Sequence, residues 1–423
     1  MRAEVVAVGT ELLLGQITDT NSRWISEQLA AFGIDVTHHQ TVGDNLERIV
    51  AALRLAASRA DVVLVCGGLG PTEDDITRDA LATLAGVPLV FHEELAQMLR
   101  QKFRRWSSAG TMPESNLRQA TVPQGASTIA PDRGTAPGLV MEIDGARVYA
   151  VPGVPDEMRE MVQGSILPEL RSLVGDEVIV SQVLRVAGMG ESAVAERLAD
   201  LFAASQNPTI AYLASMGEVK VRLTAKATSE PSARALLGPL AAEVCERLGD
   251  VVFSENDETL ETVVLRLLND SGRRIACAES LTGGGVGERL TAAPGSSETF
   301  LGSAVVYTAD VKRRVLGLTD EDLAGGTVTE ACALAMARGA IALYGADVAV
   351  SLTGAAGPEP HDGAEPGTVW VAVADANGFA HARGFFSKGE RERVRRWAEQ
   401  GGLDLARRYL AGLPLPGTSL PNR

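Results

Sequence analysis

Residues 61–77 read DVVLVCGGLGPTEDDIT, an apolar run that stops at two glycines and continues into an acidic turn. A short apolar run without polar alternation is typical of a parallel strand that is buried on both faces of a sheet. Glycines after such a strand let the backbone approach a ligand, and amides at the start of a following helix attract anions. We therefore expect a buried strand at 61–66, followed by a turn suited to phosphate or another anion.

The chain on either side repeats this alternation of strands and helices. Strands are expected at 4–8, 35–39 and 147–151, and helices at 22–32, 46–57, 75–85 and 156–162. Such alternation predicts a parallel sheet with helices on both faces, and ligands of such sheets bind beyond the carboxyl ends of the strands. We place the end of this first α/β domain at residue 170.

Acidic residues follow the glycine turn directly, as Glu73, Asp74 and Asp75. Carboxylates beside an anion-binding turn suit a divalent cation that bridges them to substrate phosphates. The alternative is that Asp74 and Asp75 cap the next helix, and the same alternative applies to Asp44 in the turn VGDN. The spacing alone leaves both interpretations open.

Two further domains are expected after residue 170. Residues 171–256 follow the order β-α-β-β-α-β, which predicts a small α+β domain of ferredoxin-like or KH-like type without obvious chemistry. Residues 257–412 predict a second α/β domain, in which parallel and antiparallel strands are mixed. The remaining residues, 413–423, include three prolines and are expected to form a flexible tail.

Composition narrows the function. The 423 residues include 39 Lys plus Arg against 54 Asp plus Glu, a net charge of −15, which disfavours direct binding to nucleic acid. The four cysteines are widely spaced without a CxxC pair, and no run is long and apolar enough for a membrane span. We therefore expect a cytoplasmic protein without a disulfide framework or a zinc ribbon. No GxxxxGK[ST] occurs, and Glu288 stands where GxGxxG needs its last glycine, so P-loop and nicotinamide-type Rossmann sites are disfavoured.

Hydroxyls and cations recur near expected strand ends in the last domain. They occur in ESLTGG (279–284), in PGSS (294–297), in SLTGAAGP (351–358), and as Tyr307 with Lys312. A serine nucleophile with a neutral lysine as base forms one class of hydrolase site. The alternative, in which the lysine is on the surface and the serines cap a helix, stays open at this point.

The order of these motifs resembles the competence- and damage-inducible CinA family over almost the whole chain. The resemblance rests on GTEL (9–12) with Thr20-Asn21, GGLGPTEDDIT (67–77), PGVPDEM (152–158), the motifs of the last domain and GTVW (367–370). It implies a three-layer α/β domain of the molybdopterin-binding type that hydrolyses ADP-ribose to AMP and ribose 5-phosphate with a divalent metal. It also implies a carboxy-terminal domain that converts nicotinamide mononucleotide to nicotinate mononucleotide and ammonia without a cofactor. A homodimer is implied as well.

Roles in the amidase domain are carried over from this resemblance by position. Ser297 would be the nucleophile, Lys312 its general base, and Tyr307 a member of the same hydrogen-bond network. Thr353 would line the site, and Arg391 would bind a charged group of the nucleotide and help to keep Lys312 neutral. Substrate-binding roles are implied for Glu279, Ser280, Thr282, Gly283 and Gly354.

In the first domain the resemblance implies that Asp75 activates the pyrophosphate. Asp44, Asp74 and Asp75 would be the metal ligands, with the choice among Mg, Mn and Co left open. The phosphates would be cradled by Gly67, Gly68 and Gly70, and further substrate contacts would come from Thr10, Glu11 and Asn21.

Two alternatives compete with this bifunctional salvage enzyme. One is a nucleotide-binding scaffold in competence or DNA-damage responses, and the other is an enzyme of the molybdopterin cofactor. A scaffold has no need of Ser297, Tyr307, Lys312, Thr353 and Arg391 together, and the fused amidase-like domain disfavours the cofactor enzyme.

Overall fold

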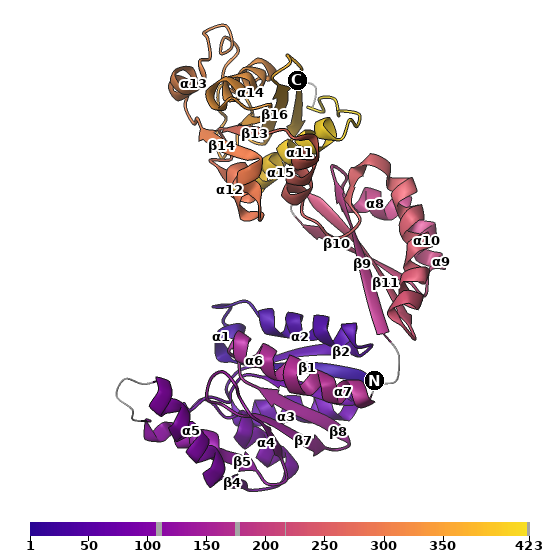
Figure 1. The fold of residues 1–423 in the computed structure, drawn as a ribbon, viewed down its shortest axis with the longest axis vertical. Helices are drawn as coiled ribbons and strands as arrows, with labels where there is room; N and C mark the ends of the chain where they lie inside the picture. The colour runs from indigo at the N-terminus through magenta and orange to yellow at the C-terminus, as the bar shows by residue number, and fades with distance from the viewer. Residues whose placement is uncertain (107–111, 174–177, 216, 421–423) are drawn as a thin grey trace. The chain divides into compact units, whose positions relative to one another are not determined.

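The computed structural model describes residues 1–106, 112–173, 178–215 and 217–420. The chain falls into two compact units (Figure 1), one formed by Met1–Val180 with Ala225–Ala235 and the other by Ser181–Thr224 with Leu236–Arg423. Across the described ranges, no helix combines the length and the apolar character that crossing a membrane requires.

The first unit is built on a six-stranded sheet with the order β2-β1-β3-β8-β7-β6. Four neighbouring strands are parallel, which confirms the predicted parallel sheet: β2 (Asp35–Val42), β1 (Arg2–Val8), β3 (Val62–Cys66) and β8 (Ala146–Val151). Two strands that the sequence analysis did not predict extend it in antiparallel fashion: β7 (Gly138–Ile143) and β6 (Ser127–Ile129).

Helices cover both faces of this sheet, as expected for a three-layer domain. Successive strand residues point to opposite faces, so Val63 and Val65 pack with one group of helices, whereas Leu64 packs with the other. The first group contains α3 (Leu46–Arg59) and α4 (Thr77–Ala85), and the second contains α2 (Thr20–Ala31), α6 (Pro155–Met161) and α7 (Leu167–Leu173). An appendage not foreseen from the sequence contains α5 (Glu93–Trp106), β4 (Leu89–Phe91) and β5 (Thr121–Pro123).

The middle segment has the predicted β-α-β-β-α-β order. Its sheet runs β10-β11-β9-β12, as in a ferredoxin-like arrangement. The elements are β9 (Val178–Ala187), α8 (Glu191–Arg197), α9 (Ala199–Ala204), β10 (Thr209–Ser215), β11 (Glu218–Ala227), α10 (Glu230–Leu248) and β12 (Val252–Ser254).

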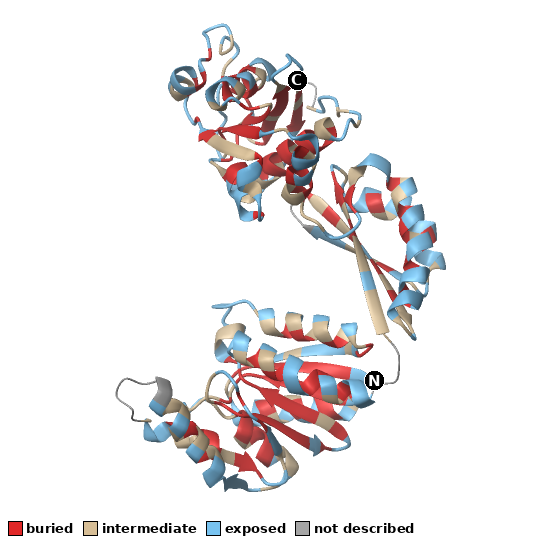
Figure 2. Cartoon of the chain, viewed as in Figure 1, coloured by how far each residue is buried: buried red, intermediate tan, exposed pale blue. Residues whose placement is uncertain are grey.

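The last segment folds around a five-stranded sheet with the order β14-β13-β15-β16-β17. Three strands are parallel, β14 (Phe300–Val305), β13 (Ile275–Glu279) and β15 (Val348–Gly354), and two are antiparallel, β16 (Thr368–Asp375) and β17 (Ala380–Phe386). The predicted mixed sheet is therefore confirmed. One face packs against α11 (Leu260–Ser271), α12 (Gly285–Ala292) and α15 (Arg391–Leu410), and the other against α13 (Ala309–Leu316) and α14 (Glu330–Tyr344). Figure 2 shows that β13 and β15 are buried at the centre of this domain.

The carboxy-terminal residues lie against β17, where the sequence analysis expected a flexible tail. The amide of Ser419 donates to the carbonyl of Gly384 at 2.8 Å, and the amide of Gly384 donates to the Thr418 hydroxyl at 3.2 Å. The proline carbonyls also contribute, since Pro414 accepts from Arg408 and Pro416 accepts from His381. Residues 413–420 are therefore part of the fold, and the end of the predicted tail, 421–423, lies outside the described residues.

Glu279 joins the sheet of the last domain to helix α12. Its carboxylate is fully buried at the end of β13. One oxygen accepts from the Gly287 amide at 2.8 Å and the Ser303 hydroxyl at 2.7 Å. The other accepts from the Thr282 hydroxyl and from the amides at the start of α12, Gly284 and Val286. A buried charge is tolerated where hydrogen bonds satisfy it in this way.

We expect Glu279→Gln to destabilise the last domain by at least about 2 kcal/mol, because an amide nitrogen in place of one carboxylate oxygen leaves two or more buried donors unpaired. The measurement is amide hydrogen exchange of the β13 and β14 peptides by mass spectrometry, which should be faster in this variant than in wild type. Glu288→Gln is the matched control, since Glu288 is an exposed residue of α12. Equal protection in the two variants would contradict the role assigned to Glu279.

Candidate functional site

Lys312 is a fully buried residue of α13, a helix that the sequence analysis did not predict. Its Nζ donates to Ser280 Oγ at 2.9 Å and to the carbonyl of Val306 at 2.8 Å. Burial lowers the pKa of Lys312, and the nearby Cys332 and Asp362 oppose that shift. The desolvated ammonium gives up its proton more readily than an exposed lysine does, which suits a general base.

Ser280, rather than Ser297, is the serine at this lysine. Ser280 is buried directly after β13, and its amide donates to the carbonyl of Leu352 at 2.9 Å. Ser297 is exposed on the short 3₁₀ turn 296–298, and the hydrogen bonds of Lys312 Nζ in the described chain go to Ser280 and Val306 instead. The structure therefore places Ser280, and not Ser297, within hydrogen-bond distance of Lys312.

The three parallel strands bring most of the predicted amidase residues to one pocket. A cavity of about 400 Å³ lies at their carboxyl edge. Five predicted residues line it: Ser280, Tyr307, Thr353, Gly354 and Arg391. Gly283 lies instead in a neighbouring pocket, which Arg391 also lines. The position of the first pocket follows the rule that ligands bind beyond the carboxyl ends of parallel strands.

Arg391 lies at the first turn of α15 and contacts the pocket rim. It donates to the Tyr307 hydroxyl at 2.8 Å and to the carbonyl of Gly357 at 2.8 Å. Arg391 was expected to keep Lys312 neutral, but the lowered pKa of Lys312 arises from burial instead. Arg391 and the half-exposed Tyr307 therefore form an outer, polar part of the pocket above the buried lysine.

Three further residues of the pocket were missed by the sequence analysis as functional: Thr327, His361 and Asp362. Asp362 accepts from the Thr327 amide at 2.8 Å and from its hydroxyl at 2.6 Å, and these hydrogen bonds lower the pKa of Asp362. The carbonyl of Thr327 in turn accepts from the Thr353 hydroxyl at 2.5 Å. The stretch around His361 and Asp362 offered only a loop rich in proline, glycine and acids.

The turn after Ser280 was expected to bind an anion of the substrate. Its amides bind the carboxylate of Glu279 instead. Glu279 occupies the amides at the start of α12, and Thr282 donates to the same carboxylate at 2.7 Å. Both side chains are buried and support the turn, so they are not presented to a substrate as the resemblance implied. In the described chain, the amides of Leu281 and Thr282 make no hydrogen bond, which leaves two donors beside Ser280.

The predicted phosphate turn of the first unit lies where β3 ends. Gly67 has a φ of 111°, and a Cβ on it would come within 2.2 Å of the carbonyl oxygen of Val8, so only glycine fits there. The Thr77 hydroxyl donates to the carbonyl of Gly67 at 2.8 Å. The buried Arg78 donates to the carbonyls of Leu69 and Gly70, each at 2.7 Å. These hydrogen bonds to its carbonyl groups hold the backbone of the turn in place.

Asp44 and Asp75 accept hydrogen bonds that stabilise turns of the first unit. Neither residue caps the helix that follows it, which was the alternative interpretation. Asp44 accepts from the Thr10 amide at 2.8 Å, which joins the loops after β2 and β1. Asp75 accepts from the amide of Thr72 at 2.9 Å and from its hydroxyl. Helix α3 is capped by Asn45. At the start of α4 the described chain shows no side-chain cap, and the residue there is Ile76.

The other residues predicted to bind substrate or metal in the first unit lie near the same edge of the sheet or on its loops. Asn21 donates to the carbonyl of Gly153 at 2.7 Å, which joins α2 to the turn after β8. Gly68 follows Gly67 with a φ of 69°. Glu11 is partly exposed beside Gly9, and Asp74 is exposed.

The predicted metal ligands do not form a preorganised site. Among the residues that the structure describes, no three Asp, Glu, His or Cys side chains come together as a group that could hold a metal ion. Asp44, Asp74 and Asp75 therefore do not fit a cage made by the protein alone. Mg²⁺ is often held by one or two carboxylates together with substrate phosphates, and that kind of site needs the substrate.

Comparison with known proteins gives three family matches in chain order. Residues 4–172 match the probable molybdopterin binding domain, residues 181–254 the damage-inducible protein CinA KH domain, and residues 257–410 the CinA C-terminal domain.

Relatives match nearly the whole chain. A CinA-like protein of Frankia casuarinae is 44% identical over 98% of this chain and 97% of its own. A putative competence-damage inducible protein of Bacillus subtilis is 40% identical over 97% of this chain and 98% of its own. A solved structure of the protein CinA from Thermoplasma acidophilum is 33% identical, covers 40% of this chain and 96% of its own, and has a TM-score of 0.37. The chain belongs to the CinA family of competence- and damage-inducible proteins.

Proposed function

We propose that the last domain is a nicotinamide-nucleotide amidase, with Ser280 as nucleophile and Lys312 as general base. The observation that carries this proposal is the 2.9 Å contact between Lys312 Nζ and Ser280 Oγ, in which the lysine is fully buried and the serine lines the pocket. Serine is a weak nucleophile until a base takes its proton, and a lysine serves as that base only in its neutral form. Burial lowers the pKa of Lys312 despite the opposing influence of Cys332 and Asp362, and its hydrogen bonds go to a hydroxyl and a carbonyl, which favours the neutral form.

The proposed reaction proceeds through an acyl-enzyme. Ser280 Oγ attacks the carboxamide carbon of nicotinamide mononucleotide while its proton passes to Lys312. The oxyanion of the tetrahedral intermediate accepts hydrogen bonds from the amides of Leu281 and Thr282. Lys312 then gives its proton to the leaving nitrogen, and ammonia departs from an ester on Ser280. Water attacks this ester, Lys312 accepts a proton from that water and returns it to Ser280 Oγ, and nicotinate mononucleotide is released.

Outer residues of the pocket suit the nucleotide portion of the substrate. The Arg391 guanidinium lies at the rim beside Tyr307, where its forked donors suit a phosphate or another anionic group. Thr353 is buried at the pocket wall, where the Asp362–Thr327 hydrogen bonds hold its position. A scaffold without catalysis does not account for a lysine buried against a serine.

For the first unit we propose that it hydrolyses the pyrophosphate bond of ADP-ribose, which gives AMP and ribose 5-phosphate. The rigid glycine turn after β3 supports this assignment, because it brings backbone close to a ligand at the edge where Asp44 and Asp75 lie. A divalent metal would neutralise the pyrophosphate, and because the described residues alone form no site for it, it would be held together with the substrate phosphates. We further propose that the protein is a cytoplasmic homodimer.

Ser280→Ala should lower the release of ammonia from nicotinamide mononucleotide by at least about 10³-fold, because it removes the nucleophile. Ser297→Ala is the matched control and should stay within about twofold of wild type, since Ser297 is exposed away from the lysine. Thermal unfolding of both variants checks that they fold. The opposite pattern, with loss only in Ser297→Ala, would return the nucleophile role to Ser297.

The pH dependence of kcat/KM should report the proton on Lys312. The rate rises with pH as the lysine becomes neutral, and the lowered pKa of Lys312 places this limb below the ordinary lysine range. Asp362→Asn removes a carboxylate that raises the pKa of Lys312, so the limb should move to lower pH. A limb that moves to higher pH in this variant, or that stays in place, would contradict the assignment of the base.

Hydrolysis of ADP-ribose should require added Mg²⁺, Mn²⁺ or Co²⁺ and should stop with EDTA. Asp75→Asn should reduce it to the background of the assay, whereas Ser280→Ala should retain it, because Ser280 belongs to the other proposed site. Chromatographic detection of AMP measures the reaction. Undiminished turnover in EDTA would contradict the metal requirement. Absence of turnover with all three metals would contradict the assignment of ADP-ribose hydrolysis to the first unit.

A further inference from the structure

Arg395, a partly buried residue of α15, holds the turn that follows Ser280. Its Nε donates to the carbonyl of Leu281 at 3.1 Å, and its Nη2 donates to the carbonyl of Thr282 at 2.6 Å. The donors of a guanidinium lie in one rigid plane, so bonds to two successive carbonyls fix both peptide groups together. The Thr282 carbonyl also accepts from the Gly285 amide at 3.4 Å, whereas in the described chain the Leu281 carbonyl accepts from Arg395 alone. The direction of the Leu281 carbonyl therefore depends on this arginine.

The Leu281 carbonyl and the Thr282 amide belong to the central peptide group of this turn. The turn is closed by the Gly283 amide, which donates to the Ser280 carbonyl at 3.1 Å. In a planar trans peptide group the C=O and the N–H point in opposite directions. A guanidinium that holds the Leu281 carbonyl on one side therefore directs the Thr282 amide to the other side.

The two sides of the turn face two different pockets. Arg395 and Gly283 line the neighbouring pocket, whereas Ser280 and Leu281 line the pocket of the proposed amidase. The cation therefore lies behind the turn, on its carbonyl side, and the reacting groups lie on its amide side.

The charge of Arg395 also strengthens the Thr282 amide as a donor. A carbonyl that accepts from a cation is polarised, and hydrogen bonds through one peptide group reinforce each other. This amide donates no hydrogen bond within the described chain, so it is available to an acceptor in the pocket. Such a donor stabilises an oxyanion, which forms only when Ser280 has attacked the carboxamide.

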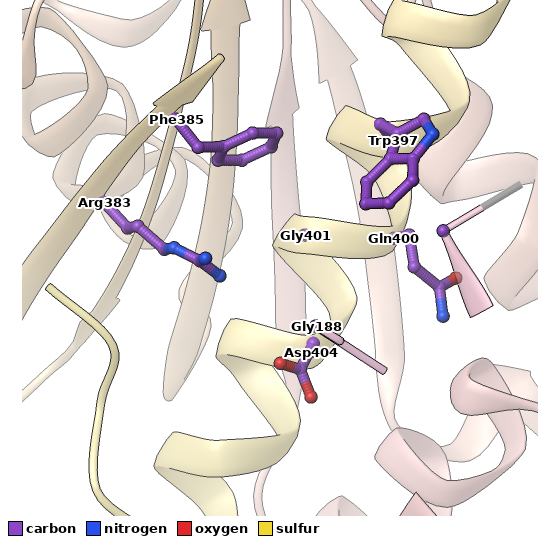
Figure 3. Close-up of a pocket in the computed structure, with 8 residues that line it drawn as sticks. Gly188, Arg383, Phe385, Trp397, Gln400, Gly401 and Asp404 are labelled. Carbon is purple, nitrogen blue, oxygen red and sulfur yellow. The ribbon is translucent and has the colours of Figure 1, made fainter. Parts of the chain in front are cut away.

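Helix α15 gives Arg395 a rigid base. Val394, which precedes it, and Ala398 are fully buried in the core of the domain. A Cβ on Gly401 would lie 3.0 Å from the Phe385 ring, so this glycine allows α15 to approach β17 closely. Figure 3 shows Phe385 projecting from β17 toward this part of the helix. Arg395 therefore extends to the turn from a helix that is fixed on the sheet.

We propose that Arg395 is a positioning residue of the amidase reaction, which orients and polarises the Thr282 amide toward the oxyanion. This inference rests on the proposed function of the pocket that Ser280 lines. Arg391 lies one helical turn earlier and contacts that pocket itself, whereas Arg395 acts through the turn. Because the oxyanion forms in the transition states and not in the bound substrate, loss of Arg395 should lower kcat and leave KM nearly unchanged.

Kinetics of ammonia release from nicotinamide mononucleotide by the full chain test this role. Arg395→Met keeps an unbranched stem without a donor, and it should lower kcat at least about tenfold, with KM within about threefold of wild type. Arg395→Lys keeps the charge, but an ammonium does not replace the guanidinium fork across two carbonyls, so its kcat should lie between those of Arg395→Met and wild type. This variant also serves as the test should Arg395→Met fail to fold.

Arg393→Met is the matched control, because Arg393 is an exposed residue of the same segment of α15. Its kcat should stay within about twofold of wild type. Thermal unfolding of every variant separates a loss of kcat from a loss of folded protein. A kcat of both Arg395 variants equal to that of Arg393→Met would contradict the proposal.

Isothermal titration with nicotinamide mononucleotide, in proteins that also carry Ser280→Ala, measures binding without chemistry. Arg395→Met should leave Kd within about threefold, whereas Arg391→Met should raise it at least about tenfold, since it removes a charged donor at the pocket. A raised Kd together with an unchanged kcat in Arg395→Met would make Arg395 a ligand of the nucleotide and overturn the positioning role. Absence of ammonia release by wild type would instead contradict the amidase function itself, and this inference would fail with it.

Discussion

Burial of the Lys312 ammonium group against Ser280 is the constraint on which the catalytic proposal depends. Removing a lysine from water costs free energy unless it is neutral or paired, and here its hydrogen bonds go to a hydroxyl and a carbonyl rather than to a carboxylate. The neutral amine is therefore favoured at the point where a base is needed. The arrangement requires β13 and β14 to run parallel, because Ser280 and Val306 follow the ends of these neighbouring strands.

Adjacent residues at the end of β13 have different tasks. Glu279 satisfies the amides at the start of α12, so the turn is fixed by a carboxylate of the protein itself. Ser280 then faces the pocket from a rigid support. Preorganisation of this kind keeps a nucleophile near its base without further reorganisation during the reaction. The first unit uses a similar device, since Thr77 and Arg78 hold the carbonyls of its glycine turn.

Strand and helix patterns predicted most of the fold, whereas contacts between distant segments decided the site. The buried strand expected at 61–66 is found as Val62–Cys66. Helix α13 was missed because its sequence, ADVKRRVL, is short and half of its residues are charged, which indicates an exposed segment. Ser280 directly follows β13 and Ser297 lies on the turn before β14, and the pairing of β13 with β14 brings Ser280, but not Ser297, beside Val306 and Lys312. The tail was misjudged because proline carbonyls, which accept hydrogen bonds, leave no periodic pattern in the sequence.

Covalent trapping tests the central claim most directly. Wild-type protein mixed with nicotinamide mononucleotide is quenched in acid within its first turnovers, digested and examined by peptide mass spectrometry. The account predicts an adduct with the mass of the substrate less ammonia on the peptide that contains Ser280. An adduct on the peptide that contains Ser297, or turnover that proceeds without any adduct on Ser280, would contradict it.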